Sequence, residues 1–288
     1  MEKADFTGIQ VHTTGMMDGT IRGAARTCFV ARCGEIEEHE MQWKGLMLAL
    51  LLAPLAGHAG PARFDHYLLA LSVAPAFCED EPQQKQKFAQ CRALSGPGFK
   101  RVPLTLHGLW PNRADRRHPA YCGGDKAGTF CRLPPLHLPA NIRARLGQVM
   151  PGAADCLDRY QWAKHGSCSG LAEADYFAAS VALTERVNRA IGREITNHVG
   201  REVDLAGLRA TLARVDPALK DAVVFDCQTP RTPDPAKRRP MLREVRVNFE
   251  VDPATGGPGR PLAYARAGHR HYNSGCPGGR AYIDSPLD

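Results

Sequence analysis

Apolar residues occur along the chain in two spacings, one typical of strands and one typical of helices. Four segments have the apolar runs or the two-residue alternation of buried strands: Tyr67–Val73, Arg101–Trp110, Ala222–Phe225 and Leu242–Val251. The first ends before Pro75, and the second is expected to run into a turn at Pro111-Asn112. In the last, every second residue from Val245 to Val251 is apolar, which predicts one buried face.

Helical spacing follows the second strand. The segments with apolar residues three or four apart are Ala140–Val149, Leu157–His165, Glu173–Ile191 and Leu205–Arg214. Asp204 is a suitable N-cap for the last helix, which should end before Asp216-Pro217. Strands and helices are interleaved without an internal repeat or a clear linker, so the sequence predicts a single α+β domain.

A short apolar segment near the N-terminus has the three parts of a secretory signal peptide. Residues 41–59 begin with a methionine, Lys44 follows, and an apolar run comes next. Gly57 and Ala59 then occupy the −3 and −1 positions of a cut before Gly60. The run is shorter than the roughly 20 residues that span a bilayer. We therefore expect a signal peptide at 41–59 that leaves no membrane anchor after cleavage.

The alternative for this segment is a buried core helix, which Pro54 would break. Residues 1–40 precede the signal and have little periodicity. We interpret 1–40 as a disordered extension or as the result of a misassigned start, with translation beginning at Met41. Residues 60–288 then form the mature domain.

Removing residues 1–59 changes the composition. The removed part holds 5 of the 37 basic and 7 of the 30 acidic residues, so 32 and 23 remain and the charge rises from +7 to +9 over 229 residues. Cys28 and Cys33 are removed, which leaves 8 of the 10 cysteines. An even number in an exported chain predicts four disulfides, with 105 possible pairings. The composition excludes collagen-like, coiled-coil and multi-pass membrane proteins, and the positive charge favours a polyanionic partner.

Two segments carry the candidate chemistry, Leu106–Pro111 and Tyr160–Cys168. Each contains a histidine followed by glycine, His107 and His165. Imidazole has the side-chain pKa nearest neutrality, so two histidines can act together as acid and base. Lys164 beside them could neutralise charge on a phosphate in the transition state.

Simpler interpretations exist for each residue taken alone. A single histidine beside glycine is more often a hydrogen-bonded turn residue, and Trp110 and Trp162 alone are more often core residues. Cys168 could be a nucleophile activated by His165, but an even set of cysteines favours a disulfide. A zinc hydrolase is a poor interpretation, because no HExxH or other ligand cluster accompanies the histidines.

Taken together, the two segments resemble the active-site motifs of the ribonuclease T2 family. The matching text is HGLWP at residues 107–111 and WAKHGSC at 162–168, in the order the family has them. Tyr67–Cys78 resembles the first core strand of that family, with Val73 at the position of a usual tryptophan. The segment from Cys227 to Cys276 resembles its last strands and bridge. The resemblance covers most of residues 64–284.

This resemblance implies a fold and a reaction. The implied fold is a single α+β domain with a central, mostly antiparallel β-sheet, flanked by helices and stapled by disulfides. The implied activity is metal-independent endonucleolytic cleavage of single-stranded RNA through a 2′,3′-cyclic phosphate to 3′-phosphate ends. By position, His165 is the base, His107 the acid and Lys164 the phosphate-stabilising cation. The physical argument supports the pair but leaves the direction of proton transfer open.

The same resemblance implies a setting for the enzyme. It predicts a monomer that is periplasmic or secreted, needs no metal or cofactor, and has single-stranded RNA as its partner. Trp110, Asn112, Tyr160 and Trp162 are the expected substrate-binding residues.

The chain differs from the family motifs at three positions, 112, 160 and 161. Tyr160-Gln161-Trp162 stands where the family usually has His-Glu-Trp, and Gln161 can donate a hydrogen bond from its amide but cannot carry a proton. Asn112 replaces an acidic residue linked to base recognition. We expect activity that is reduced or shifted in pH dependence. The alternative is a catalytically silent homologue that binds RNA or a cell surface.

The eight cysteines fit the family frame in four expected pairs. These are Cys122–Cys168, Cys227–Cys276, Cys78–Cys156 and Cys91–Cys131. The first would tie the two catalytic segments together.

Arginine dominates the basic residues of the mature chain, with 25 arginines against 7 lysines. Arginine is the better bidentate partner for phosphate, but a GC-rich genome also enriches arginine. The segment Arg266–Tyr272 (RAGHRHY) is basic and aromatic enough to touch RNA; the alternative is a solvated loop.

Overall fold

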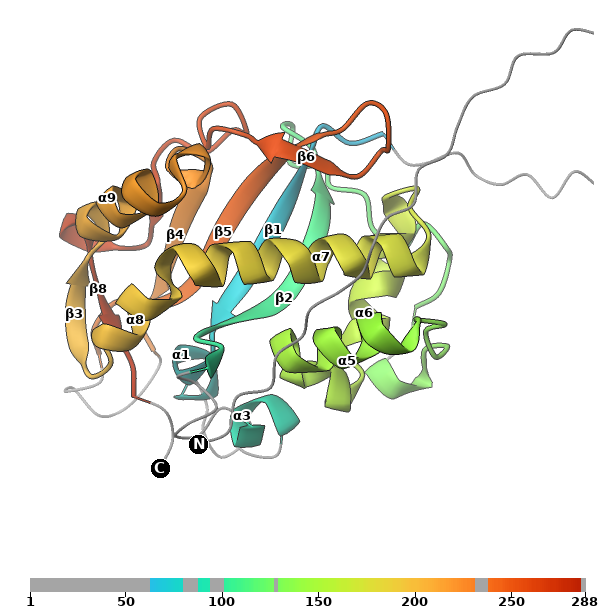
Figure 1. Ribbon diagram of the computed structural model, residues 1–288, viewed down its shortest axis with the longest axis horizontal. Coiled ribbons are helices and arrows are strands. Elements are labelled where there is room, and N and C mark those ends of the chain that lie inside the picture. The colour runs from blue at the N-terminus through green and yellow to red at the C-terminus, as the bar shows by residue number, and fades with distance from the viewer. Residues whose placement is uncertain (1–62, 80–87, 94–100, 127–128, 231–237, 286–288) are drawn as a thin grey trace, which may run out of the picture. The chain divides into compact units, whose positions relative to one another are not determined.

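The computed structural model describes residues 63–79, 88–93, 101–126, 129–230 and 238–285 (Figure 1). The expected extension at 1–40 and the expected signal peptide at 41–59 lie outside these residues and stay predictions. Within the described residues, no helix is long and apolar enough to cross a bilayer.

A single sheet organises the described part of the chain. Its strands are β1 (His66–Val73), β2 (Leu104–Asn112), β3 (Arg201–Asp204), β4 (Val223–Gln228), β5 (Met241–Val251), β6 (Pro258–Pro261), β7 (Asn273–Ser274) and β8 (Arg280–Ile283). The central order is β2-β1-β5-β4-β7, with β6 and β8 also paired to β5 and β3 paired to β8. The β4–β7 and β5–β8 pairs are parallel and the other pairs are antiparallel. The expected α+β class with a mostly antiparallel sheet is confirmed.

The helices lie around this sheet. They are α1 (Ala74–Glu79), α3 (Ala89–Ala93), α5 (Ala140–Val149), α6 (Leu157–Lys164), α7 (Glu173–Val187), α8 (Arg193–Asn197) and α9 (Leu205–Val215). The expected helix 173–191 is α7 followed by a π-helical turn at Asn188–Gly192. The predicted cap of α9 is confirmed, because Ala206 N donates to Asp204 Oδ1 at 3.1 Å.

The two faces of the sheet differ in polarity because side chains alternate along each strand. Leu69 and Leu71 of β1 pair with Val247 and Val245 of β5 on the face that belongs to the hydrophobic core. Helix α7 crosses the sheet (Figure 1) and contributes apolar residues to the same core. The register places Ser72 opposite Glu244, on the other face of the sheet. Helices α5, α7, α8 and α9 therefore pack on the apolar face, and polar side chains gather on the other.

The expected turn at Pro111-Asn112 is wrong, because both residues belong to β2. Pro111 pairs with Tyr67 and Asn112 with His66. Strand β2 ends the central path of the sheet, beside β1. A strand in that position tolerates proline because the missing N–H is not needed on its outer side.

Four disulfides staple the described residues. The expected pairs Cys122–Cys168 and Cys227–Cys276 are present. The other two expected pairs are wrong: Cys78 bonds Cys91 and Cys131 bonds Cys156. Local packing explains the difference, since α1 and α3 contact each other and carry Cys78 and Cys91. The 3-10 turn with Cys131 packs against α6, which begins directly after Cys156.

Candidate active site

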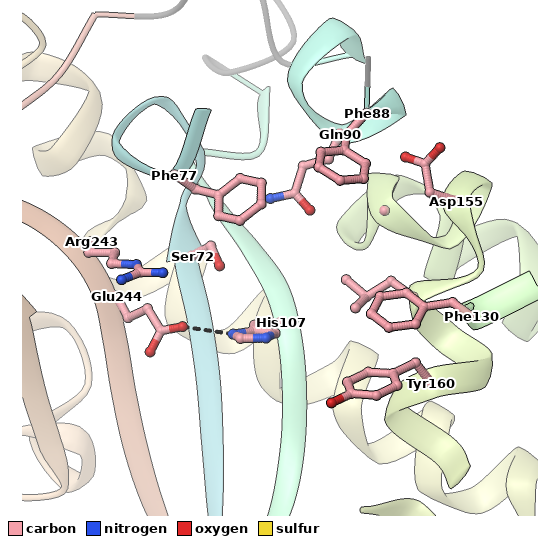
Figure 2. Close-up of a pocket in the computed structure, with 12 residues that line it drawn as sticks. Ser72, Phe77, Phe88, Gln90, His107, Phe130, Asp155, Tyr160, Arg243 and Glu244 are labelled. Carbon is pink, nitrogen blue, oxygen red and sulfur yellow. Dashed lines mark hydrogen bonds and ion pairs between the residues drawn. The ribbon is translucent and has the colours of Figure 1, made fainter. Parts of the chain in front are cut away.

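His107 lies on β2 and is held by a carboxylate from across the sheet. Its Nδ1 is 2.7 Å from Oε1 of Glu244 on β5, and the two side chains point toward one another in Figure 2. Strand β1 separates the two strands, so the contact spans the width of one strand. The His107 side chain is 37% exposed, whereas that of Glu244 is only 7% exposed. One ring nitrogen is therefore fixed by a buried group while part of the ring stays accessible.

Glu244 is a candidate functional residue that the sequence reasoning missed. Its second oxygen accepts from Arg246 Nε at 2.9 Å, and Arg246 also reaches Asp226 Oδ2 at 3.1 Å. Burial alone would raise the pKa of Glu244, but the hydrogen bond from His107 and the charges of His107 and Arg246 outweigh it. They lower the pKa to about 2, so the carboxylate is ionised near neutral pH. One feature of the sequence could have indicated this residue. Glu244 and Arg246 are charged and occupy alternate positions of a predicted strand, on the face opposite its apolar residues.

His165 follows directly after α6, and its surroundings are unlike those of His107. Its backbone N–H donates to Gln161 O at 3.0 Å, the last helical bond of α6. Its Nδ1 is buried and has no hydrogen-bond partner. Burial lowers the pKa of His165, and the nearby charges of Lys164 and His107 lower it further, to about 3. The imidazole is therefore neutral at physiological pH and able to accept a proton.

Trp110 contacts both histidines. Its ring is edge-on to His107, with centroids 5.1 Å apart, and stacked on His165 at 5.2 Å. The indole N–H donates to Gln161 Oε1 at 2.9 Å. Gln161 is only 1% exposed, and its recorded contact uses the carbonyl oxygen rather than the amide that we expected to donate. Trp110 and Gln161 thus bring the two catalytic segments together.

Both motif glycines are needed for this close packing. A Cβ on Gly108 would lie 2.1 Å from Gln161 Oε1 and 2.4 Å from Trp110 Nε1. A Cβ on Gly166 would lie 2.3 Å from Cε3 of Trp162. A larger residue at either position would push an aromatic ring or its anchor out of place.

Lys164 and Tyr160 form a second polar pair on α6. Lys164 Nζ donates to Tyr160 Oη at 3.0 Å, and the Tyr160 ring stacks on Phe130 at 4.1 Å. Burial alone would raise the pKa of Tyr160, but hydrogen bonds from Lys164 and Tyr121 lower it. The tyrosine that replaces the usual family histidine therefore holds the ammonium group in place.

A cavity of about 380 Å³ opens beside His107 (Figure 2). Its lining residues are Ser72, Phe77, Phe88, Gln90, His107, Phe130, Gly152, Asp155, Leu157, Tyr160, Arg243 and Glu244. Of the expected substrate-binding residues, Tyr160 lines this cavity and Trp110, Asn112 and Trp162 do not. Asn112 is 8% exposed at the end of β2, and Trp162 lies edge-on to Tyr176 at 5.6 Å, against the core. Phe77 on α1 and Phe88 directly before α3 belong to no motif, so nothing in the sequence marked them as cavity residues.

The acid stability of the fold should depend on these buried groups. The pKa values of His66 and His165 are lowered from 6.5 to about 4 and about 3, chiefly by burial, and that of Glu244 is lowered from 4.5 to about 2. In each case the unfolded chain binds a proton that the native state does not, so stability falls as pH drops. The two histidines lower the stability as the pH falls below about 6.5, and Glu244 lowers it as the pH falls below about 4.5.

Urea unfolding at pH 7, 5 and 4 checks this expectation. The free energy of unfolding should decrease at each step, and His66→Asn should flatten the decrease between pH 6.5 and 4. A free energy that is constant from pH 7 to pH 4 would contradict the assignment of neutral, buried histidines.

The site as a whole has the parts of an acid–base enzyme: two imidazoles in different surroundings, a lysine and an aromatic cavity. Comparison with known proteins identifies the class of enzyme. The model of the Ribonuclease T2 family matches residues 64–255, and the chain belongs to this family. The expected family and enzyme class are confirmed, and the protein is an endoribonuclease of the T2 type.

Named relatives agree with this membership. Ribonuclease I of Escherichia coli (strain K12) is 30% identical over 212 residues, which cover 66% of this chain and 76% of that protein. A probable ribonuclease of Haemophilus influenzae is 35% identical over 135 residues, which cover 44% of each chain. A mutant of RNase MC1 in complex with 5′-UMP superposes with a TM-score of 0.53 at 18% identity, covering 77% of this chain and 99% of that one. This last likeness concerns the fold alone.

Proposed function

We propose that this enzyme cleaves single-stranded RNA inside the strand, without a metal ion, by transfer of protons through two histidines. His165 takes the proton from the ribose 2′-hydroxyl, whose oxygen then attacks the adjacent phosphorus. His107 gives a proton to the departing 5′-oxygen as the P–O bond breaks. The product is a 2′,3′-cyclic phosphate, which water can open to a 3′-phosphate with the roles of the histidines reversed.

The observation that carries the proposal is the contrast between the two imidazoles. Burial and the charges of Lys164 and His107 lower the pKa of His165 to about 3, which keeps this ring unprotonated, as a base must be before it accepts a proton. The carboxylate of Glu244, 2.7 Å from His107, orients that ring through Nδ1–H and leaves Nε2 for the substrate. His107 is thus suited to hold and release a proton from Nε2.

The remaining α6 residues support the phosphate. Lys164, held by Tyr160, supplies the positive charge for the oxyanion that develops at phosphorus. Gln161 serves as a positioning residue for Trp110 rather than as a proton carrier. A glutamine is adequate for that role, which supports activity despite the departure from the family motif.

The cavity beside His107 suits a nucleobase. Phe77, Phe88, Phe130 and Tyr160 give it aromatic walls, and Gln90 and Asp155 offer polar groups for base edges. Bases stack on aromatic side chains with about 1–3 kcal/mol each. The related fold of RNase MC1 was solved with 5′-UMP and with 5′-GMP bound. We assign this cavity to a base of the RNA next to the cleaved linkage.

The proposal includes export. Cleavage of the signal at 41–59 releases residues 60–288 as a monomer into the periplasm or the medium. The four disulfides of the described residues are stable in such oxidising compartments.

Incubation of the mature chain with single-stranded RNA in excess EDTA tests the proposal. We expect undiminished cleavage and fragments that end in 2′,3′-cyclic phosphate at early times. Loss of cleavage in EDTA would indicate a metal-dependent enzyme. Retained RNA binding without any cleavage would favour the silent homologue instead.

A further inference from the structure

Two basic loops lie together beside the catalytic residues. The first, residues 113–121, joins β2 to the region of α6, and the second, residues 262–272, precedes β7. The two loops are in contact at Ala114 and Gly268, since a Cβ atom added to Gly268 would lie 3.8 Å from the carbonyl oxygen of Ala114. Ala114 N also donates to Asp65 Oδ2 at 2.8 Å, which fixes the first loop to the start of β1.

The first loop is anchored in the active site at both ends. It starts directly after Asn112, on the strand that carries His107 and Trp110. At its other end Tyr121 N donates to Lys164 O at 2.9 Å, and the Cys122–Cys168 disulfide follows. The loop that carries Arg116 and Arg117 is therefore joined at one end to the strand of His107 and at the other to the backbone of Lys164.

The cations of these loops outnumber the carboxylates that could neutralise them. Asp115 binds Arg113, and Glu250 binds both Arg260 and Arg266. Arg116, Arg117 and Arg270 are exposed and have no carboxylate partner in the described part of the chain.

The electrostatics of neighbouring histidines agree with an excess of positive charge. Burial lowers the pKa of His269, and the charges of Arg246 and Arg116 lower it further. His118 adds to the lowering of the His165 pKa, after burial and the charges of Lys164 and His107. Arg116 of the first loop thus lies close enough to His269 of the second loop to lower its pKa, and a bound anion would offset the positive charge of Arg116.

We propose that Arg116, Arg117 and Arg270 form a second anion-binding site, which holds phosphates of the RNA strand outside the cleaved linkage. The choice of RNA as the ligand rests on the proposed function. A single strand presents a row of phosphates, and unpaired guanidinium groups bind phosphate oxygens through charge-assisted hydrogen bonds. The site raises affinity for long strands and takes no part in the chemical step.

The test compares a long and a minimal substrate. The triple variant Arg116→Asn, Arg117→Gln, Arg270→Gln removes the three charges; Asn is used at 116 because that residue has a φ of 65°, which Asn adopts readily. The matched control replaces Arg189, Arg193 and Arg214 with Gln. These are exposed residues at or near α8 and α9, at the end of the molecule opposite α6 (Figure 1).

We expect the triple variant to lose about tenfold or more in kcat/KM on an RNA of about 20 nucleotides at low salt. On a dinucleoside monophosphate, which carries only the cleaved phosphate, it should stay within about twofold of wild type. The slope of log affinity against log salt should fall by about 2, since each phosphate contact in a single strand contributes about 0.7. The control triple variant should keep the wild-type kcat/KM on both substrates.

Equal loss on both substrates, no loss on the long RNA, or the same loss in the control triple would overturn the proposal. Binding of the same RNA, followed by fluorescence anisotropy, separates this site from the proposed function. If wild type cleaves neither substrate, the catalytic proposal fails, while weaker binding by the triple variant alone still supports the second site.

Discussion

His165→Ala is expected to lower kcat on single-stranded RNA by about 10³-fold or more, the largest effect of any single substitution in this enzyme. The substitution removes the neutral imidazole that we propose takes the 2′-hydroxyl proton. His165 packs under Trp110, so some loss of order around the ring is also expected. Circular dichroism and urea unfolding separate that effect from the loss of the base.

His107→Ala should cause a loss of similar size, because the 5′-oxygen is a poor leaving group without a proton. The matched control is His137→Ala, since His137 is exposed and does not line the cavity beside His107. The control should keep wild-type kcat and KM. If either catalytic variant retained full activity on RNA, the two-histidine mechanism would be wrong.

Outside the two histidines, Glu244→Gln is expected to have the largest effect, a fall in kcat of about 10- to 100-fold with KM within about twofold. The substitution keeps the size of the side chain but removes the charge that faces His107 Nδ1. The ring then loses the charged acceptor that fixes its Nδ1–H tautomer. Glu244→Asp, which keeps the charge on a shorter side chain, should recover part of the activity.

A merely structural role for Glu244 predicts a different outcome. The ¹⁵N chemical shifts of His107 should indicate a proton on Nδ1 in wild type and a mixture of tautomers in Glu244→Gln. Glu250→Gln is the matched control, because Glu250 is on the same strand but pairs with Arg260 and Arg266 at its end. Equal effects of the two substitutions on kcat, or unchanged His107 shifts, would remove Glu244 from the catalytic machinery.

Local patterns predicted most of the fold. The alternation after Val245 identified β5, and the helical spacing at 140–149 gave α5 with its observed bounds. Both signals depend on neighbours within a few residues, which a sequence displays directly. The end of β2 was predicted wrongly because Pro111 is tolerated only in a strand at the edge of the sheet. Whether a strand lies at the edge depends on strands far away in the chain.

The site was predictable where its residues sit in contiguous motifs. His107, Gln161, Lys164 and His165 lie in such motifs. The structure brings His107, Gln161 and His165 together around Trp110, and Lys164 contacts Tyr160 on the same helix. Glu244 lies in no such motif, since it follows His107 by 137 positions and meets it only through the strand order. The pairing of Cys78 with Cys91 likewise depends on the packing of two short helices.

The division of labour between the two histidines is the central claim, and a substrate with a good leaving group tests it most directly. In uridine 3′-(4-nitrophenyl phosphate) the departing phenolate needs no proton, so the general acid becomes dispensable. The kcat of His107→Ala on this compound should be within about tenfold of wild type, while its kcat on RNA stays strongly reduced. The kcat of His165→Ala should be strongly reduced on both substrates. Recovery in His165→Ala instead, or equal loss in both variants, would contradict the assignment of His165 as base and His107 as acid.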